Sequence, residues 1–178
     1  AFESLRMNDA AQTVYEDALR KFTDSDLRPK YMFQIMNIYY KEGKYDDASR
    51  LHQQLVNLYP ESDVKADADY VMGQIKYLKR DYNGAIALLS PIVPGNGNYP
   101  YARYTMGVSY AGSGKMSEAE AAFQNVAELK PSNSAGQEMK DAANKCAYCR
   151  TYSNVLANAA AENVKFGCGF QNGDDQRW

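Results

Sequence analysis

Apolar residues recur at intervals of three and four along the middle of the chain, which is the spacing of one face of an α-helix. Two such stretches follow each other, with apolar positions at Ile35, Ile38 and Tyr39 and then at Leu51, Leu55 and Leu58. Gly43 separates the stretches and Pro60 follows the second. Because glycine ends a helix at little cost and proline cannot continue one, the pattern predicts two helices joined by a tight turn.

The same pattern occurs three times, over residues 30–60, 66–94 and 100–131. Each copy has an aromatic residue or methionine followed three positions later by alanine: Tyr45 and Ala48, Tyr82 and Ala85, Met116 and Ala119. Ala85 and Ala119 are 34 residues apart, and Ala48 and Ala85 are 37 apart. Such a period is typical of helical repeats. We therefore expect six helices in three antiparallel pairs, with the alanines where two helices approach closely.

The three copies resemble the tetratricopeptide repeat family, whose pattern is W-x2-L-G-x2-Y, then A-x3-F, then P. The third copy matches it with Met106, Gly107, Tyr110, Ala119, Phe123 and Pro131. The first copy has Ile35, Tyr39, Ala48, His52 and Pro60, and the second has Met72, Gly73, Ala85 and Leu89. The departures are Met36 for the glycine, Lys76 for the tyrosine, an early Pro94, and Met32, Asp69 and Arg103 for the tryptophan. The resemblance implies an all-α fold, a right-handed superhelix of antiparallel helix pairs with capping helices at both ends.

The whole chain, residues 1–178, is expected to form one domain of this type. Its expected parts are an N-terminal helix or partial repeat over 1–28, repeats over 29–62, 66–99 and 100–133, and C-terminal capping helices with a tail over 134–178. The N-terminal helix is predicted for residues 7–23, with an inward face of Ala11, Val14, Tyr15, Ala18, Leu19 and Phe22. The C-terminal helices are predicted for 135–150 and 153–165.

The sequence Gly-Ser-Gly-Lys at 112–115 is similar to the end of a phosphate-binding loop. That loop requires G-x-x-x-x-G-K-[ST] after a buried strand. Ser109 occupies the place of the first glycine, and Met116 occupies the place of the hydroxyl residue. Gly114 is therefore expected to end one helix of the third repeat, and Met116 to begin the next.

Charge and composition exclude several classes of function. The formal net charge of −2 provides no electrostatic attraction for nucleic acid. No apolar run approaches the ~18 residues of a transmembrane segment. His52 is the only histidine and is expected to pack inside a helix pair. Neighbouring carboxylates such as Asp46 and Asp47, or Asp174 and Asp175, do not face the same way on a helix. Without converging titratable groups, we expect no enzymatic activity and no cofactor.

The three cysteines lie in the last third of the chain, at Cys146, Cys149 and Cys168. Arg150 stands where c-type haem attachment requires histidine, and the strand context of a thioredoxin-like site is missing. Three cysteines also fall short of the four ligands of structural zinc, so no metal site is expected. Two alternatives remain: one of the pair forms a disulfide with Cys168, or all three are reduced thiols on a packed face.

In this family the first helices of successive repeats line a concave groove in which a protein or peptide partner usually binds. The resemblance places there Lys30, Phe33, Asn37, Tyr40 and Lys41 from the first repeat, Asp67, Tyr70, Gln74 and Tyr77 from the second, and Tyr101, Tyr104 and Val108 from the third. Phe33 replaces a lysine that some members use to hold a C-terminal carboxylate, so that clamp is not expected.

The stretch from Leu55 to Gln74, LVNLYPESDVKADADYVMGQ, is also similar to bacterial envelope members of the family. These include the lipoprotein of the outer-membrane β-barrel assembly machine and the Tol-Pal coordinator. The resemblance favours the periplasm or the cell surface over the cytoplasm. The expected function is a protein-binding scaffold or adaptor; the alternative is a structural subunit of a multi-subunit envelope or surface assembly.

Overall fold

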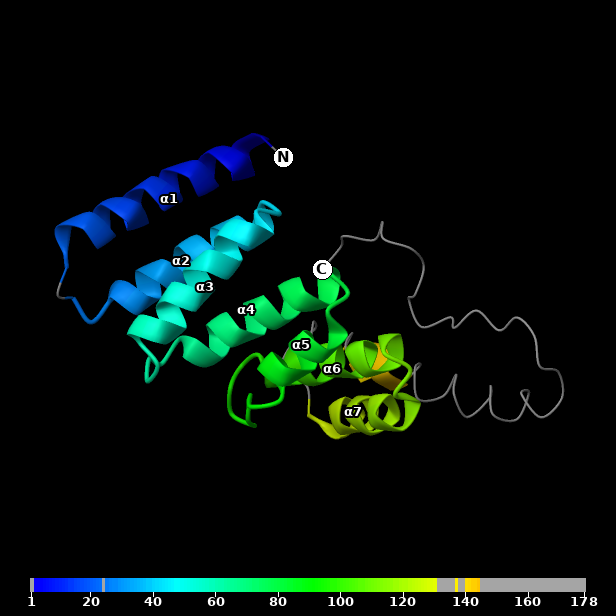
Figure 1. The fold of residues 1–178 in the computed structure, drawn as a ribbon. Coiled ribbons are helices and arrows are strands. Elements are labelled where there is room, and N and C mark those ends of the chain that lie inside the picture. The colour runs from blue at the N-terminus through cyan, green and yellow to red at the C-terminus, as the bar shows by residue number, and fades with distance from the viewer. Residues whose placement is uncertain (1, 24, 131–136, 138–139, 145–178) are drawn as a thin grey trace, which may run out of the picture. The chain divides into compact units, whose positions relative to one another are not determined.

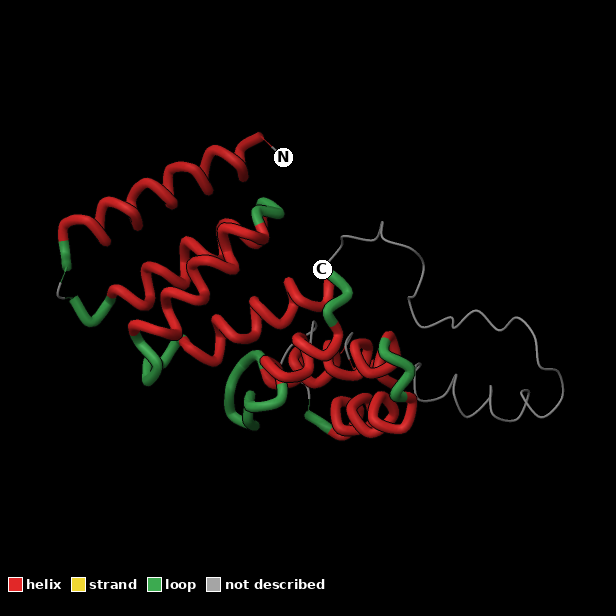
Figure 2. The backbone as a smooth tube through the Cα atoms, in the orientation of Figure 1, coloured by secondary structure: helices red, strands yellow, loops and turns green. Residues whose placement is uncertain are grey.

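The computed structural model describes residues 2–23, 25–130, 137 and 140–144 of the chain. Every element in these ranges is helical, and they contain no β-strand (Figures 1 and 2). The helices with described bounds are α1 (Phe2–Lys21), α2 (Arg28–Lys41), α3 (Tyr45–Leu58), α4 (Lys65–Leu78), α5 (Tyr82–Leu89), α6 (Tyr99–Gly112) and α7 (Met116–Glu128). The prediction of six repeat helices with a further helix at the N-terminus is confirmed.

Contacts within the chain divide it into two compact units, Ala1–Asn98 and Tyr99–Trp178. The first unit contains α1 and the helix pairs α2/α3 and α4/α5, and the second contains the pair α6/α7. The first unit has a core of buried residues from three helices: Met32, Met36, Ala48, Leu55, Ala68, Val71, Met72 and Ile75. In the second unit, the buried apolar residues include Ala102, Met106, Ala119, Ala122, Phe123 and Val126.

Each pair turns through the same backbone geometry. Gly43 (φ +72°) and Gly114 (φ +79°) adopt the left-handed conformation that favours glycine, as their positions predict. In the second pair the equivalent residue is Arg80, with φ +61°. The next residue of each turn donates its backbone N–H to a carbonyl oxygen five residues earlier, at 2.8–2.9 Å. The repeat therefore imposes its turn even where the sequence offers no glycine.

The small residues of the repeats lie where the two helices of a pair approach closely. Ala48, Ala85 and Ala119 are all buried, as expected. A Cβ atom built on Gly73 would lie 2.6 Å from Leu89, and one on Gly107 would lie 2.5 Å from Phe123. In the first pair, fully buried Met36 stands at the glycine position. His52 stands at the position of the second helix that Leu89 and Phe123 occupy in the other two pairs.

The prediction for α1 needs a correction. Tyr15 stacks on Tyr31 of α2 with 6.0 Å between ring centroids, and Leu19 packs against the core of the first unit. Val14 and Phe22 were expected to point inward, but they are 65% and 57% exposed. The reason is that α2 is the one described helix that packs against α1. A single neighbour buries a narrow strip, and the apolar pattern of α1 is wider than that strip.

The C-terminal predictions can be followed only in part. Gln137 and residues 140–144 are helical, and Ala143 is buried. Lys140 Nζ donates a hydrogen bond to the Leu129 carbonyl at 3.1 Å, which links this segment to the end of α7. The second predicted capping helix and all three cysteines lie outside the described residues. Across the described ranges, no helix combines the length and the apolar character that crossing a membrane requires.

Candidate protein-binding face

The predicted groove residues of the first unit lie on α2 and α4, which contact each other. We call this set of side chains the α2–α4 face: Lys30, Phe33, Asn37, Tyr40 and Lys41 on α2, and Asp67, Tyr70, Gln74 and Tyr77 on α4. In both helices the spacing is three, four and three residues, so the side chains form one stripe along each helix. The two stripes are related by a shift of 37 residues. Equivalent positions therefore carry Phe33 and Tyr70, and Tyr40 and Tyr77.

Two equivalent tyrosine pairs mark the turn end of this face. The Tyr40 ring lies 6.2 Å from the Tyr45 ring, and the Tyr77 ring lies 6.2 Å from the Tyr82 ring. Burial, and then the neighbouring ring, raises the pKa of Tyr40 and of Tyr77. Both phenols therefore stay protonated at neutral pH. Among the described residues, neither hydroxyl has a hydrogen-bond partner. Each pair thus presents a rigid ring and a hydrogen-bonding group.

The middle of the face combines apolar rings with an amide pair. Phe33 and Tyr70 are half-buried and pack against the core of the first unit. The Gln74 Nε2 donates a hydrogen bond to the Tyr70 hydroxyl at 2.9 Å. Asn37 is half-buried one turn further along α2 from Phe33. This region therefore offers a firmly seated aromatic surface beside polar amides.

The charged residues at the start of each stripe make intramolecular contacts. Lys30 forms an ion pair with Asp63 at 3.0 Å. Asp67 Oδ1 accepts hydrogen bonds from Asn96 Nδ2 at 3.1 Å and Asn98 Nδ2 at 2.9 Å, which ties the segment after α5 to α4. At the other end, Lys41 is exposed. The sequence could not assign these partners to Asp67, because the asparagines lie about thirty residues away in a loop of no regular pattern.

The third set of predicted groove residues lies on α6, in the second unit. Tyr101 and Tyr104 are half-buried, and the Tyr104 ring packs against Phe123 of α7 at 5.6 Å. Val108 is buried, so its side chain provides little surface for a partner. Within this unit, Tyr104 contributes to the packing of the helix pair as well as to its surface.

A charge network that the sequence did not reveal joins the first two repeats. His52 Nε2 lies 2.8 Å from Asp69 Oδ1, and Lys65 Nζ lies 2.7 Å from Asp69 Oδ2. His52 and Asp69 are buried, which confirms His52 as a packed residue and gives it a partner. Burial raises the pKa of Asp69, but the hydrogen bonds from His52 and Lys65 outweigh it and bring that pKa below its usual value.

The signal for this pair was present in the departures from the repeat pattern. His52 stands where the family has an aromatic residue in the second helix, and Asp69 stands at the tryptophan position of the next repeat. Both are polar residues at positions that the pattern buries. Two such substitutions in adjoining repeats indicate a buried pair. The pair connects α3 to α4, and Asp69 and Lys65 also line a shallow hollow of about 260 Å³ beside the loop that precedes α4.

Asp46 and Asp47 do not form a pair of acid–base groups, as their adjacent positions predict, and instead lie at the start of a helix. Both lie in the first turn of α3, where negative charge is favoured. Asp46 forms an ion pair with Lys79 at 2.6 Å, across from the first pair to the second, and Asp47 is paired with Arg50. Among the described residues, no group of three or more histidine, cysteine, aspartate or glutamate side chains could hold a metal ion.

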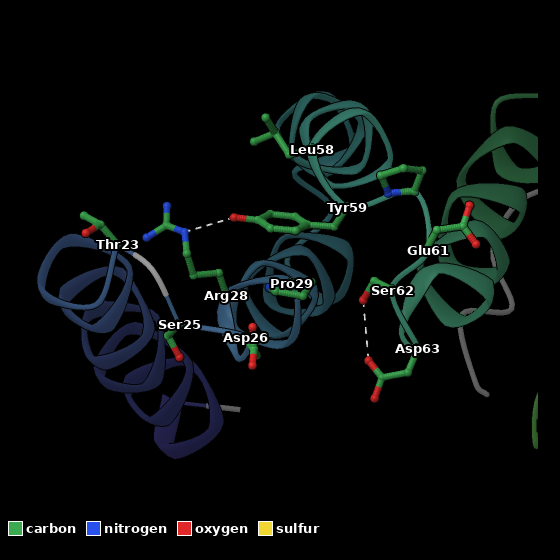
Figure 3. Close-up of a pocket in the computed structure, with 11 residues that line it drawn as sticks. Thr23, Ser25, Asp26, Arg28, Pro29, Leu58, Tyr59, Glu61, Ser62 and Asp63 are labelled. Atoms are coloured by element: carbon green, nitrogen blue, oxygen red, sulfur yellow. Dashed lines mark hydrogen bonds between the residues drawn. The ribbon is translucent and has the colours of Figure 1, made fainter.

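A shallow hollow of about 510 Å³ lies at the opposite end of the first unit, between the loops that precede α2 and α4 (Figure 3). Arg28 forms part of its wall. Its Nε donates to the Tyr59 hydroxyl at 3.1 Å, and its Nη1 donates to the carbonyl oxygens of Leu19 at 2.6 Å and Phe22 at 3.2 Å. Arg28 therefore fastens the end of α1 and the end of α3 to the start of α2, and it is not available as a free cation.

A comparison with protein-family models identifies a repeat family in the first helix pair. The family model described as tetratricopeptide repeat matches residues 30–62, which comprise α2, α3 and the loop that follows. No curated protein matches the chain. The match falls on the first of the three helix pairs, and the other two repeat its turn geometry and its packing alanines. The chain thus has an all-α fold of the tetratricopeptide repeat type.

Proposed function

We propose that this protein is a non-enzymatic scaffold that binds a segment of a protein partner along the α2–α4 face. Repeats of this family generally mediate protein–protein interaction. The observation that supports this face is the equivalence of its two stripes, in which Tyr40 and Tyr77 present rings held by Tyr45 and Tyr82. Aromatic residues that are already rigid lose little entropy when a partner binds, so they are favoured at hot spots.

The partner is a segment with apolar side chains and backbone or side-chain hydrogen-bonding groups, rather than a strongly charged one. Lys30 and Asp67 already make intramolecular contacts, and the amides of Asn37 and Gln74 lie between the aromatic positions. Binding that depends on rings and amides is weakly screened by salt, whereas binding by exposed charges weakens as ionic strength rises. We therefore expect an affinity that changes little with salt concentration.

The test uses peptides selected on the full chain from a displayed random library. Tyr40→Ala and Tyr77→Ala should each weaken binding by about 2 kcal/mol, or roughly thirtyfold in affinity. Leu78→Ala is the matched control, because Leu78 is an exposed apolar residue next to Tyr77 but outside the stripe. Tyr40→Phe and Tyr77→Phe separate the hydroxyl from the ring. Peptides that bind both alanine variants as tightly as the parent, with unchanged melting temperatures, would refute the proposal.

We also propose an envelope location, supported by the sequence similarity around residues 55–74. The three cysteines provide an independent measurement, because disulfides persist in oxidising compartments and are rare in the cytosol. Protein purified from its native source should carry one disulfide between Cys168 and either Cys146 or Cys149. Intact mass after alkylation without reductant decides this: three alkylated cysteines would argue against the bond and against the location.

A further inference from the structure

The segment that follows α5 contains an asparagine directly before a glycine. The chain has three such pairs, Asn83-Gly84, Asn96-Gly97 and Asn172-Gly173, and the third lies outside the described residues. In an Asn-Gly pair the backbone nitrogen of the glycine can attack the side-chain amide carbon of the asparagine, because no Cβ atom on the glycine shields it. The surroundings of the two described pairs decide which of them is placed to react.

The side chain of Asn96 is folded toward the chain that follows it. Its Oδ1 accepts a hydrogen bond from the Asn98 backbone N–H at 2.7 Å. In such a turn the side-chain amide carbon lies on the same side as the next backbone nitrogen, which belongs to Gly97. The Asn98 N–H also stabilises the negative charge that develops on Oδ1 during an attack, as a donor in an oxyanion hole does. Gly97 is exposed, and a Cβ atom built on it meets nothing within 4 Å, so the approach is open.

Asn83 lies in a different setting, in the first turn of α5. The Gly84 N–H donates to Asp81 Oδ1 at 3.0 Å, so the nitrogen that would attack is engaged in the N-cap of the helix. Among the described residues, the Gly97 N–H has no hydrogen-bond partner. The same dipeptide is therefore protected at Asn83 and available at Asn96.

We propose that Asn96 is a site of spontaneous modification, at which the side-chain amide is converted to a carboxylate. The Gly97 nitrogen forms a bond to Cγ of Asn96, the Cγ–Nδ2 bond breaks, and the proton of the Gly97 N–H leaves with the amide nitrogen as ammonia. Water then opens the cyclic imide at either of its carbonyl carbons, which gives aspartate or isoaspartate at residue 96. A water molecule is consumed and an ammonia molecule is released, and no oxidant or reductant is needed.

The conversion acts on the contact that fastens this segment to α4. Asp67 Oδ1 accepts hydrogen bonds from Asn96 Nδ2 at 3.1 Å and from Asn98 Nδ2 at 2.9 Å. A carboxylate at residue 96 removes the first of these donors and places a like charge beside Asp67. The segment 93–98 is then released from α4. A negative charge is also added beside the α2–α4 face, whether or not a partner binds there.

The test follows both asparagines in one peptide. Trypsin releases residues 81–103 as a single peptide, so fragment-ion mass spectrometry compares Asn83 and Asn96 directly. The full chain is aged in mildly alkaline buffer, either folded or in urea, and sampled over time. In urea the two sites should convert at similar rates. In the folded protein Asn96 should keep its rate, whereas Asn83 should slow by roughly fivefold or more, because Gly84 must first break its hydrogen bond to Asp81.

Gly97→Ala is the matched control. The space around Gly97 accepts a methyl group, and that methyl group crowds the attacking nitrogen. Conversion at Asn96 should become several-fold slower in this variant, and conversion at Asn83 should not change. The proposal is overturned if folding protects Asn96 as strongly as Asn83, or if Asn96 converts equally fast in the Gly97→Ala variant.

Release of the segment is tested by hydrogen exchange on the full chain. Asn96→Asp carries the charge of the product, and its backbone amides in 93–98 should exchange roughly tenfold faster or more, because repulsion replaces a hydrogen bond to a charged group. Adding Asp67→Asn should restore the rate of the parent, because amide and carboxylate then face each other in exchanged positions. Unchanged exchange in Asn96→Asp, or exchange that the second substitution does not restore, would refute the release.

Discussion

Arg80 adopts a backbone conformation that glycine adopts in the other two repeats. Its φ is +61°, against +72° for Gly43 and +79° for Gly114, and each of the three follows the first helix of a pair. A left-handed conformation crowds the Cβ atom of an ordinary residue against its own backbone. The turn hydrogen bond and the packing of α4 on α5 hold Arg80 in place, so this residue stores strain that the fold tolerates.

Replacing Arg80 with glycine should therefore stabilise the protein. Relief of the strained left-handed conformation should add about 1–2 kcal/mol to the free energy of unfolding. The larger conformational entropy of glycine in the unfolded chain should reduce that gain by about 0.5–1 kcal/mol. We expect Arg80→Gly to raise the free energy of unfolding by up to about 1 kcal/mol. Urea denaturation measures it.

The converse change provides the matched control. Gly43→Ala and Gly114→Ala should each lower the free energy of unfolding by about 1 kcal/mol. Built Cβ atoms at these two positions meet no other atom within 4 Å, so the loss would come from the backbone alone. Equal stability of all three variants and the parent would contradict the argument.

The buried Asp69 should make stability depend on pH in acid. Its pKa in the folded protein lies below the usual 3.8, so the carboxylate stabilises the fold at any pH above that value. As the pH falls through the lowered pKa, the carboxylate takes up a proton and this contribution is lost. Asp69→Asn should reduce the free energy of unfolding by about 1–3 kcal/mol at neutral pH. Its deficit should shrink as the pH falls below 3.8.

Denaturant unfolding of the parent and Asp69→Asn at a series of pH values measures this difference. Glu61→Gln is the control, because it removes one carboxylate at an exposed position. A deficit for Asp69→Asn that stays constant between neutral pH and strong acid would show that the ionised carboxylate is not the stabilising species.

At the scale of helices, the second and third pairs are held together by a large side chain of one helix that packs against a glycine of the other. Leu89 fills the space over Gly73, and Phe123 fills the space over Gly107. Leu89 is fully buried and cannot move aside without disturbing its neighbours. In the first pair, both of these positions differ: Met36 stands at the glycine position, and His52 stands at the position of Leu89 and Phe123.

Adding one methyl group at these contacts should be costly. Gly73→Ala and Gly107→Ala should each lower the free energy of unfolding by about 1–3 kcal/mol, although alanine is the better helix former. Combining Gly73→Ala with Leu89→Val should recover part of the loss, because the smaller side chain leaves room for the new methyl group. If Gly73→Ala is as stable as the parent, α4 and α5 are further apart than the structure places them.

Arg28 has a corresponding role for α1. It donates to two carbonyl oxygens at the end of that helix and to Tyr59 beyond α3. Arg28→Met keeps much of the apolar stem but removes these donors, so α1 should open more readily while the other helices of the unit stay closed. Hydrogen exchange followed by mass spectrometry should show faster exchange in α1. The control is Tyr59→Phe, which removes one of the three acceptors and should have a smaller effect.

For the whole molecule, the division into two units has a consequence for stability. The main cluster of buried core residues in the first unit comes from α2, α3 and α4, all within Ala1–Asn98. Repeat proteins are stabilised mainly by contacts between neighbouring repeats, so a block of repeats can fold without the rest. A fragment of residues 1–98 should therefore be helical and unfold cooperatively.

Circular dichroism and urea denaturation of that fragment test the division. The control is a fragment of residues 1–58, which keeps α2 and α3 but lacks α4 and its core residues Val71, Met72 and Ile75. It should be much less stable. An unstructured 1–98 fragment would show that the second unit is required for the first to fold.

The sequence by itself determined the repeat: the helix pairs, the turns at Gly43 and Gly114, and the packing alanines Ala85 and Ala119. These features follow from local rules, because a helix face, a left-handed turn and a close helix contact each require particular residue types at particular spacings in the sequence. The stripes of the α2–α4 face could also be placed on their helices, because the spacing of α2 is repeated in α4.

Tertiary structure alone decided which faces are covered and which polar groups meet. Val14 and Phe22 are exposed because one described helix packs against α1. The apolar pattern of a helix does not show how many other helices pack against it. Asp69 reaches His52 from the next repeat, and Arg80 takes its left-handed turn because α4 and α5 must pair. Each of these features depends on residues that are far apart in the sequence and are brought together by folding. The energy of such a contact depends on both partners, so neither residue indicates it by itself.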